Sequence, residues 1–404
     1  MSDQPSSTFK PIKYNEPLIL RNSKVTNWPC YQWKTKDWLR NCADLQLNFR
    51  IHDKDSQQIP WENEAITRID ATLDQFLDWR NNKITQPNNS FADFDPANFW
   101  AYSSYNHLAK LPYESSKALI ESISWSSIDF GSHLGKDGSS STLWIGSTGA
   151  ATPCHYDTYG YNIVTQIVGK KLWILFPPSD AVNLYPTRIP FEESSVFSEV
   201  NLCRPDFNLF PKFREAHPYS VILEPGDVLY VPHHWWHYVK CYDDQPDGLC
   251  ISINQWLPTD NTFDSLCEGV TSLLINTLFP FYQPDDENWL NDSTDDSLLN
   301  DPSMIISLIG KLSSNQSNLC SKIDRWIDYI PENCEPVQEI DYNQLMAKYF
   351  PDVDVKSIHN KQDCENKIGQ QTIEHPAKSI IKCFLKPNVI ELISKNILDE
   401  IRRD

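Results

Sequence analysis

Two short stretches of the sequence carry residue types that bind metal ions. His155 and Asp157 stand two apart within Thr152–Asp157, and His237 lies in the later stretch Trp235–Val239. On a β-strand, residues two apart project from the same face, so His155 and Asp157 would point together. Two imidazoles and one carboxylate are the donor set of mononuclear non-haem iron sites. A zinc hydrolase uses the same donors, so the spacing alone leaves both metals open.

The third ligand has two rivals, because His233 and His234 lie just before His237. His237 is preferred since it stands beyond Pro232, inside the aromatic stretch, whereas the other two would occupy a polar loop tip. With 10 histidines in an acid-rich chain, a single His-x-Asp pair is also expected by chance. The metal hypothesis therefore depends on strands that carry these residues to one place.

Such a metal site needs a fold that returns His237 to the side of His155. A barrel or a double-sheet jelly roll does this. Strand-like runs surround both stretches, and Gly169 between two of them predicts a hairpin. A helix is expected over 66–81, and residues 178–218 show little periodicity, which predicts a functional insert or lid. The expected strands are 17–21, 48–52, 99–102, 139–146, 162–168, 172–176, 220–223, 227–231, 235–242 and 250–256.

The texture of the sequence changes near residue 258, where helical periodicity begins. Three segments are predicted: flanking strands and a helix over 1–94, a β-rich catalytic domain over 95–257, and a helical region over 258–404. The helices would cover the sheet or pair two subunits as a homodimer. They are expected at 263–278, 305–312, 319–330, 342–349 and 382–401, with an acidic loop at 284–303.

Composition narrows the class of protein. The chain of 404 residues is 40% hydrophobic, with 14 Trp, 17 Tyr and 18 Phe, which is ample for a large core. Its net charge of −19 disfavours a nucleic-acid partner, because no large basic surface is available to displace counterions. The same charge is compatible with a basic peptide or protein substrate.

Several absences in the sequence favour a cytoplasmic or nuclear protein over a secreted one. Residues 1–8 lack the charged and apolar segments of a signal peptide. No apolar run reaches the length of about 18 residues that a membrane span needs. The 11 cysteines are scattered, without a Cys-x-x-Cys pair, so neither a disulfide framework nor a structural zinc site is expected.

Residues 95–256 resemble the JmjC family of iron(II)- and 2-oxoglutarate-dependent oxygenases. The hydroxylase branch, which includes the asparaginyl hydroxylase of hypoxia-inducible factor, is nearer than the multidomain histone demethylases. Other strings are similar to the branch that associates with small heat shock proteins, among them Phe99-Trp-Ala-Tyr102, Tyr185-Pro-Thr-Arg-Ile-Pro190 and Ser252-Ile-Asn254. The strings shared with the whole family are Leu143-Trp-Ile-Gly146, Thr152-Pro-Cys-His-Tyr-Asp157, Gly169-Lys-Lys-Leu-Trp-Ile-Leu-Phe-Pro-Pro178, Leu184-Tyr-Pro186, Pro225-Gly-Asp-Val-Leu-Tyr-Val-Pro232 and Trp235-Trp-His237.

The resemblance implies a fold and a site. The fold would be mainly β with α: a double-stranded β-helix of the jelly-roll or cupin-like type, with N-terminal flanking elements and a C-terminal helical region. Iron(II) would be the metal, and 2-oxoglutarate and O₂ the cosubstrates. The residues that match the family's motifs are His155, Asp157 and His237 as iron ligands, and Lys171, Thr152, Tyr102, Asn162 and Asn254 as binders of 2-oxoglutarate.

The leading hypothesis from the sequence is a dioxygenase that hydroxylates a side chain of a partner protein or peptide. N-methyl demethylation uses the same iron chemistry and stays open. The alternative from another class is a JmjC-fold adaptor that binds a small heat shock protein with little turnover. Complete matches to the three metal ligands and to Lys171 favour the enzyme, because a binding module has no need of all four.

Overall fold

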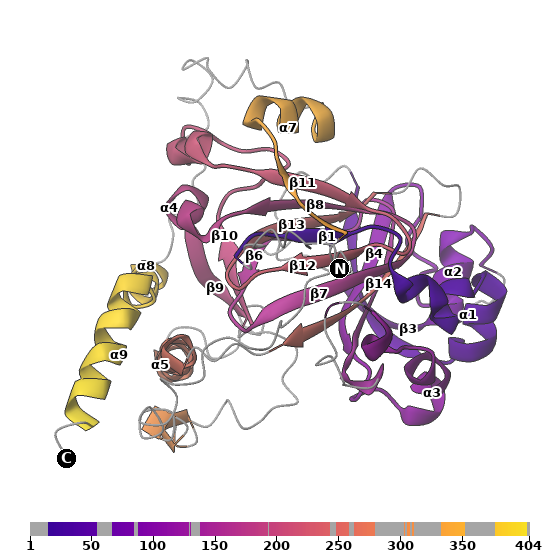
Figure 1. The fold of residues 1–404 in the computed structure, drawn as a ribbon, viewed down its shortest axis with the longest axis horizontal. Coiled ribbons are helices and arrows are strands. Elements are labelled where there is room, and N and C mark those ends of the chain that lie inside the picture. Colours follow the sequence, from indigo (N-terminus) through magenta and orange to yellow (C-terminus); the bar gives the residue numbers. More distant parts are fainter. Residues whose placement is uncertain are drawn as a thin grey trace, which may run out of the picture.

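The strands of the chain form two β-sheets that pack against each other, one of nine strands and one of seven in the part that is described (Figure 1). All pairs of neighbouring strands in the described part are antiparallel; in one of them His237 lies opposite His155. Apolar residues of both sheets, such as Val164 and Trp173, share one buried cluster between them. The computed structural model describes residues 15–54, 67–84, 88–128, 130, 138–192, 194–242, 248–257, 262–278, 303, 305–307, 309–310, 333–351 and 376–401.

Each sheet is assembled from strands that are far apart in the sequence. In spatial order, the nine-stranded sheet contains β15 (Cys334–Pro336), β1 (Leu18–Leu20), β12 (Val228–Val231), β7 (Tyr161–Val168), β14 (Leu249–Leu257), β5 (Thr142–Ser147), β4 (Phe99–His107), β2 (Gln46–Asp53) and β3 (Thr67–Thr72). The seven-stranded sheet contains β16 (Gln338–Glu339), β11 (Tyr219–Leu223), β8 (Lys171–Phe176), β13 (Trp236–Cys241), β6 (Ala151–Asp157), β10 (Ser195–Ser198) and β9 (Pro186–Glu192).

Eight strands of the core, β5 to β8 and β11 to β14, alternate between the two sheets. The chain passes from β5 to β6, β7 and β8, and later from β11 to β12, β13 and β14, changing sheet at every step. This winding produces the jelly-roll core that the sequence predicts. It also explains why strands such as β7 and β8 are almost wholly buried, since each is covered on both faces.

The hairpin predicted at Gly169 is wrong, although both of its strands are present. β7 pairs with β12 and β14, and β8 pairs with β11 and β13, so the two strands belong to different sheets. Gly169, with φ +66°, turns the chain from one sheet to the other. A glycine turn between two apolar runs looks the same in sequence whether the runs pair with each other or stack.

Replacing Gly169 by alanine is expected to lower the free energy of unfolding by at least about 2 kcal/mol. The left-handed backbone disfavours a side chain, and the new Cβ would meet the backbone oxygen of Leu249 and the thiol of Cys250. Chemical denaturation would measure the loss. Gly149→Ala is the control, because Gly149 has φ +90° but its nearest neighbour would lie at 3.8 Å. Equal losses in the two variants would show that strain, not the clash, dominates.

Of the segment 66–81, which is predicted as one helix, the first half is a strand and the second half is a helix. β3 covers Thr67–Thr72 and pairs with β2, and only then does α2 begin, at Leu73. Thr72 marks the change, because its hydroxyl accepts from the amide of Gln75 at 3.2 Å while Gln75 Oε1 accepts from the amide of Thr72 at 3.0 Å. This capping box starts the helix. The helices beside β2–β4 in Figure 1 are α1 (Thr35–Cys42), α2 (Leu73–Arg80) and α3 (Tyr113–Glu121).

The segment 178–218 is not the irregular insert that its lack of periodicity predicts. It contains the short helix α4 (Ala181–Leu184) and the strands β9 and β10, which pair with each other. β10 also pairs with β6, where Phe197 lies opposite His155 and Ser195 opposite Asp157. These strands therefore extend the seven-stranded sheet directly beside two of the candidate metal ligands.

The C-terminal region contains strands as well as helices. β15 pairs with β1 of one sheet and β16 pairs with β11 of the other, so residues 334–339 join the two sheets. The sequence analysis missed these strands because they are only two or three residues long. Among the described residues, the helices are α5 (Thr262–Leu278), α7 (Tyr342–Tyr349), α8 (Pro376–Phe384) and α9 (Pro387–Ile401), and residues 305–307 and 309–310 of the helix predicted over 305–312 are also helical.

The C-terminal helices occupy two places. α7 packs Leu345 and Met346 into the buried cluster of the seven-stranded sheet. α5, α8 and α9 share a separate apolar cluster and lie together in Figure 1. The single helix predicted over 382–401 is two helices, because Pro387, which lacks an amide hydrogen, begins the second. The helix expected at 319–330 and residues 284–302 of the acidic loop lie outside the described residues. Among the described helices, none combines the length and hydropathy of a membrane span.

Candidate metal centre

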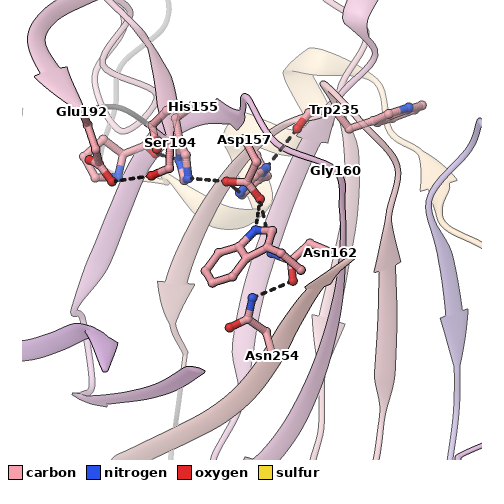
Figure 2. A network of polar contacts seen from close by, with 12 residues as sticks. His155, Asp157, Gly160, Asn162, Glu192, Ser194, Trp235 and Asn254 are labelled. Atoms are coloured by element: carbon pink, nitrogen blue, oxygen red, sulfur yellow. Dashed lines mark hydrogen bonds and ion pairs between the residues drawn. The ribbon is translucent and has the colours of Figure 1, made fainter. Parts of the chain in front are cut away.

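The structure brings His155, Asp157 and His237 together. β6 and β13 are neighbours with His155 and His237 directly opposite, and Asp157 follows on the same face of β6. One ligand atom from each side chain lies within 4.8 Å of the other two. The histidines are buried, and the side chain of Asp157 is 12% exposed. Figure 2 shows His155 and Asp157 facing each other at the end of the sheet.

Backbone contacts fix the orientation of both imidazoles. Nδ1 of His155 lies 2.8 Å from the carbonyl oxygen of Pro153, and Nδ1 of His237 lies 3.0 Å from that of Trp235. Each Nδ1–H therefore donates to its own strand, which leaves the Nε2 lone pair directed inward. The two Nε2 atoms lie 3.6 and 3.9 Å from Oδ1 of Asp157.

The imidazole of His237 is held neutral. Burial, with the neighbouring His155, lowers the pKa of His237 to about 4 against the opposing pull of Asp157. A neutral imidazole is the form that binds a metal ion, so this side chain needs no deprotonation at pH 7.

The carboxylate of Asp157 is oriented by its outer oxygen. Oδ2 accepts from the indole nitrogen of Trp256 at 2.7 Å and from the amide of Asn162 at 3.3 Å, as Figure 2 shows. The chain of contacts continues, because Asn254 donates to Asn162 at 2.8 Å and accepts from Trp144 Nε1 at 2.7 Å. Oδ1 is thereby left to face the two histidines.

Asn162 and Asn254, which are expected to bind 2-oxoglutarate, lie beside the metal ligands. Asn162 donates to Asp157 and Asn254 donates to Asn162, so together they position the carboxylate of Asp157. Their contact with a cosubstrate stays a prediction. The sequence analysis missed Trp256, although Ser252, Asn254 and Trp256 alternate along β14 and so share one face.

A second polar group lies deeper between the sheets. Lys171, the first residue of β8, is 2% exposed. Its ammonium donates to Ser252 Oγ at 2.7 Å and Tyr102 Oη at 3.3 Å, and Tyr102 is also hydrogen-bonded to Thr152. Three predicted residues thus meet here, with Ser252 as a fourth that was not predicted.

No ion pair between Lys171 and a carboxylate occurs among the described residues. Burial disfavours the ammonium of Lys171, and the ionisable groups that act on it are the Tyr102 hydroxyl and the thiols of Cys241 and Cys250. Hydroxyl and thiol groups are neutral at pH 7. The chain therefore holds a buried ammonium without a formal countercharge, which is a costly arrangement unless an anion binds there.

A bulge in β6 places Thr152 beside this lysine. Thr152 and His155 are three apart and would point to opposite faces of a regular strand. Between the pairs His237–His155 and Val239–Thr152, however, β6 contains one residue more than β13. The extra residue restores Thr152 to the face of the metal ligands.

Aromatic side chains and one carboxylate line the outer side of the site. Tyr105 has φ +56°, and its ring centroid lies 4.8 Å from that of Trp144 and 6.2 Å from that of Trp256. Burial and the nearby Glu192 raise the pKa of Tyr105 well above its usual value. Glu192 accepts from Ser194 at 3.4 Å, on the β9–β10 connection beside His155 (Figure 2). This wall is suited to a side chain with a polar or basic group.

The rival ligands His233 and His234 are not part of this centre. They lie on the turn before β13 and contact Asp264 of α5. The structure thus gives them a carboxylate of their own, where the sequence predicted a polar loop tip.

Comparison with known proteins places the chain among proteins of this architecture. It matches the Cupin-like domain family over residues 8–263. HSPB1-associated protein 1 of Homo sapiens is 41% identical over 296 residues, covering 70% of this chain and 58% of that protein. JmjC domain-containing protein D of Dictyostelium discoideum is 28% identical over 246 residues, covering 57% and 49%. Lysine-specific demethylase 8 of Xenopus tropicalis is 26% identical over 249 residues, covering 60% and 48%. The chain thus spans little more than half of its human relative.

Proposed function

Because the chain belongs to the family of cupin-like JmjC domains, we propose that it is an iron(II)- and 2-oxoglutarate-dependent oxygenase that hydroxylates a side chain of a partner protein. One observation carries the proposal. The site combines a three-ligand metal centre with a buried ammonium, that of Lys171, which has no carboxylate partner among the described residues. A simple metal hydrolase has no use for the second feature.

The donor set fits the proposed metal. Two imidazole nitrogens and one carboxylate oxygen, from His155, His237 and Asp157, suit iron(II) and leave positions open for other ligands. Bound there, iron(II) with 2-oxoglutarate and O₂ supplies the oxidative decarboxylation and C–H hydroxylation that define this enzyme class. The protein residues bind, orient and exclude water.

The residues around Lys171 fit a dicarboxylate. An ammonium and the hydroxyls of Tyr102, Thr152 and Ser252 would hold a carboxylate at the inner end of the pocket by charge-assisted hydrogen bonds. The other end of the same molecule would then reach toward the metal ligands. The aromatic wall with Glu192 would hold the substrate side chain on the outer side, which favours a polar or basic group.

Turnover of 2-oxoglutarate tests the proposal without knowledge of the substrate. The iron-loaded chain is expected to convert 2-oxoglutarate to succinate slowly in the absence of substrate. If the iron-loaded chain shows no turnover and no metal-dependent binding of 2-oxoglutarate, the enzyme hypothesis is refuted. Proteins that bind to a His155→Ala variant would then be treated with the active chain and compared by mass spectrometry. Hydroxylation adds one oxygen atom, whereas N-methyl demethylation removes a methyl group, so the measurement distinguishes these two reactions.

Trp256→Phe is expected to weaken metal binding by about 10- to 100-fold, as loss of a contact that orients a metal ligand generally does. The substitution keeps an aromatic ring but removes the donor to Oδ2 of Asp157. Titration with iron(II) under anaerobic conditions would measure the change. Trp79→Phe is the control. This variant loses an equivalent hydrogen bond, from the indole nitrogen on α2 to the carbonyl oxygen of Phe94. Unchanged affinity in Trp256→Phe would contradict the orienting role.

A second function is suggested by the name of the human relative, HSPB1-associated protein 1. The chain would bind a small heat shock protein, either as the substrate of the oxygenase or as an adaptor's partner. Binding measured with both the active chain and the His155→Ala variant distinguishes the two. Equal binding to the two chains without any hydroxylation would favour the adaptor. If neither chain binds the small heat shock protein, this partner is excluded.

A further inference from the structure

A second group of potential metal ligands lies outside the centre described above. His233 and His234 occupy the turn before β13, and Asp264 lies in the first turn of α5. One ligand atom from each of the three lies within 4.8 Å of the others. Nε2 of His233 is 3.0 Å and Nε2 of His234 is 4.0 Å from Oδ2 of Asp264. None of these residues belongs to the first centre.

The spacing of the donor atoms is close to what a tetrahedral ion requires. Ligands about 2.0–2.1 Å from Zn(II) lie about 3.3 Å from one another in that geometry. The two distances in the structure, 3.0 and 4.0 Å, lie on either side of this value. The side chains are 22%, 31% and 27% exposed, so an ion can reach them from solvent and a water molecule can complete the coordination.

The turn presents His233 in a form that is ready to bind. Its Nδ1 lies 2.8 Å from the carbonyl oxygen of Gly160, on the connection that follows Asp157. The Nδ1–H therefore donates to this oxygen, which turns Nε2 toward Asp264, where it forms a hydrogen bond with Oδ2 at 3.0 Å. Metal-bound histidines are generally oriented in this way, by a hydrogen bond from the other ring nitrogen to a backbone oxygen.

His234 is held beside His233 by strained backbone. Its φ of +61° is uncommon for a residue with a side chain and disfavours the folded state by about 1–2 kcal/mol. The conformation brings the two imidazole centroids to 3.6 Å, with the ring of Tyr156 4.8 Å from His234 on the other side. Strain of this kind persists where the surrounding structure requires the conformation, and it is frequent at functional sites.

The charges around the cluster favour a cation. Asp264 and Glu268 stand one turn apart on α5, and Glu268 pairs with Arg188 of β9 at 2.9 Å. Two carboxylates and one guanidinium leave one negative charge in excess when the imidazoles are neutral.

We propose that His233, His234 and Asp264 form a second metal site, which takes a divalent ion of the Zn(II) class and ties the start of α5 to the turn before β13. Two imidazoles and a carboxylate are a donor set of Zn(II) sites. The site would link the C-terminal helices to the β-core by a bond that depends on metal supply. It does not depend on the proposed oxygenase function.

Zinc stoichiometry in the full chain tests this site apart from the first. In a His155→Ala/His237→Ala chain, equilibrium dialysis against Zn(II) is expected to show one bound ion. Adding His234→Ala or Asp264→Asn is expected to weaken that binding by at least about 100-fold. The control is His217→Ala, because His217 also faces a carboxylate, that of Asp180 at 3.0 Å, but no second histidine joins this pair in the part of the chain that is described.

The results separate the two sites. A chain without His155 and His237 that binds no Zn(II) would overturn the proposal, and so would undiminished binding after His234→Ala and Asp264→Asn. If the chain lacking both histidines does not fold, the same variants in the otherwise intact chain give the answer, because two bound ions should fall to one. Circular dichroism would show that each variant is folded.

Discussion

Asp157→Ala is expected to reduce metal-dependent formation of succinate by at least about 100-fold, more than loss of any contact that only orients a ligand. The substitution removes the one carboxylate that faces both histidines, with Oδ1 at 3.6 and 3.9 Å from their Nε2 atoms. It also leaves the indole of Trp256 and the amide of Asn162 without their acceptor. Iron(II) titration and succinate release would both be measured.

The matched control is Asp227→Ala. Asp227 is also buried and accepts from Arg21 and from the amide of Glu224, but it lies on the turn before β12. Both Asp227→Ala and Asp157→Ala should lower the free energy of unfolding by about 1–3 kcal/mol, because each leaves buried hydrogen-bond donors without an acceptor. Succinate formation per folded molecule should not change. If Asp157→Ala retained its metal and its turnover, the assignment of the metal ligands would be refuted.

Lys171→Met is expected to have opposite effects on binding and on stability. Affinity for 2-oxoglutarate should fall by about 10- to 100-fold, because a charge-assisted hydrogen bond contributes about 1.5–3 kcal/mol. The free energy of unfolding should stay the same or rise, because the variant no longer buries an ammonium that lacks a countercharge. Methionine has a similar length and fills the same space.

Lys170→Met is a close control for this variant. Lys170 is the neighbouring residue, but it is 32% exposed and pairs with Glu224 at 3.0 Å on the surface. The Lys170→Met variant should change neither the affinity for 2-oxoglutarate nor the free energy of unfolding by much, since an exposed ion pair contributes little. Calorimetric titration with 2-oxoglutarate and thermal unfolding would measure the two effects. A Lys171→Met chain that binds normally but unfolds more easily would show that the lysine is structural.

The residues of the metal centre could be predicted because they depend on short strings and on a simple period. His155 and Asp157 are two apart on one strand, and the Pro225–Pro232 stretch leads directly to His237. The resemblance to the JmjC family also predicted Lys171. What the strings cannot supply is register, which the pairing of distant strands sets. The hydrogen bonds of Trp256 to Asp157 and of Trp144 to Asn254 follow from that register.

The errors in the fold have the same origin. The turn at Gly169 has every local sign of a hairpin, and only the neighbours β11 and β12 decide that its strands lie in different sheets. Thr152 reaches the face of His155 through a bulge that no spacing rule reveals. The strands β9 and β10 are short and contain prolines or serines, so their pairing with each other and with β6, not their composition, makes them strands.

The short segment Cys334–Glu339 has a consequence for how the chain folds. β15 pairs with β1, which lies more than three hundred residues earlier, and β16 pairs with β11. Contacts between such distant residues raise the contact order and slow folding. A nascent chain exposes the hydrogen-bonding edges of β1 and β11 until residue 339 has emerged. During that time both edges are open to pairing with another chain, and β15 and β16 later cover them.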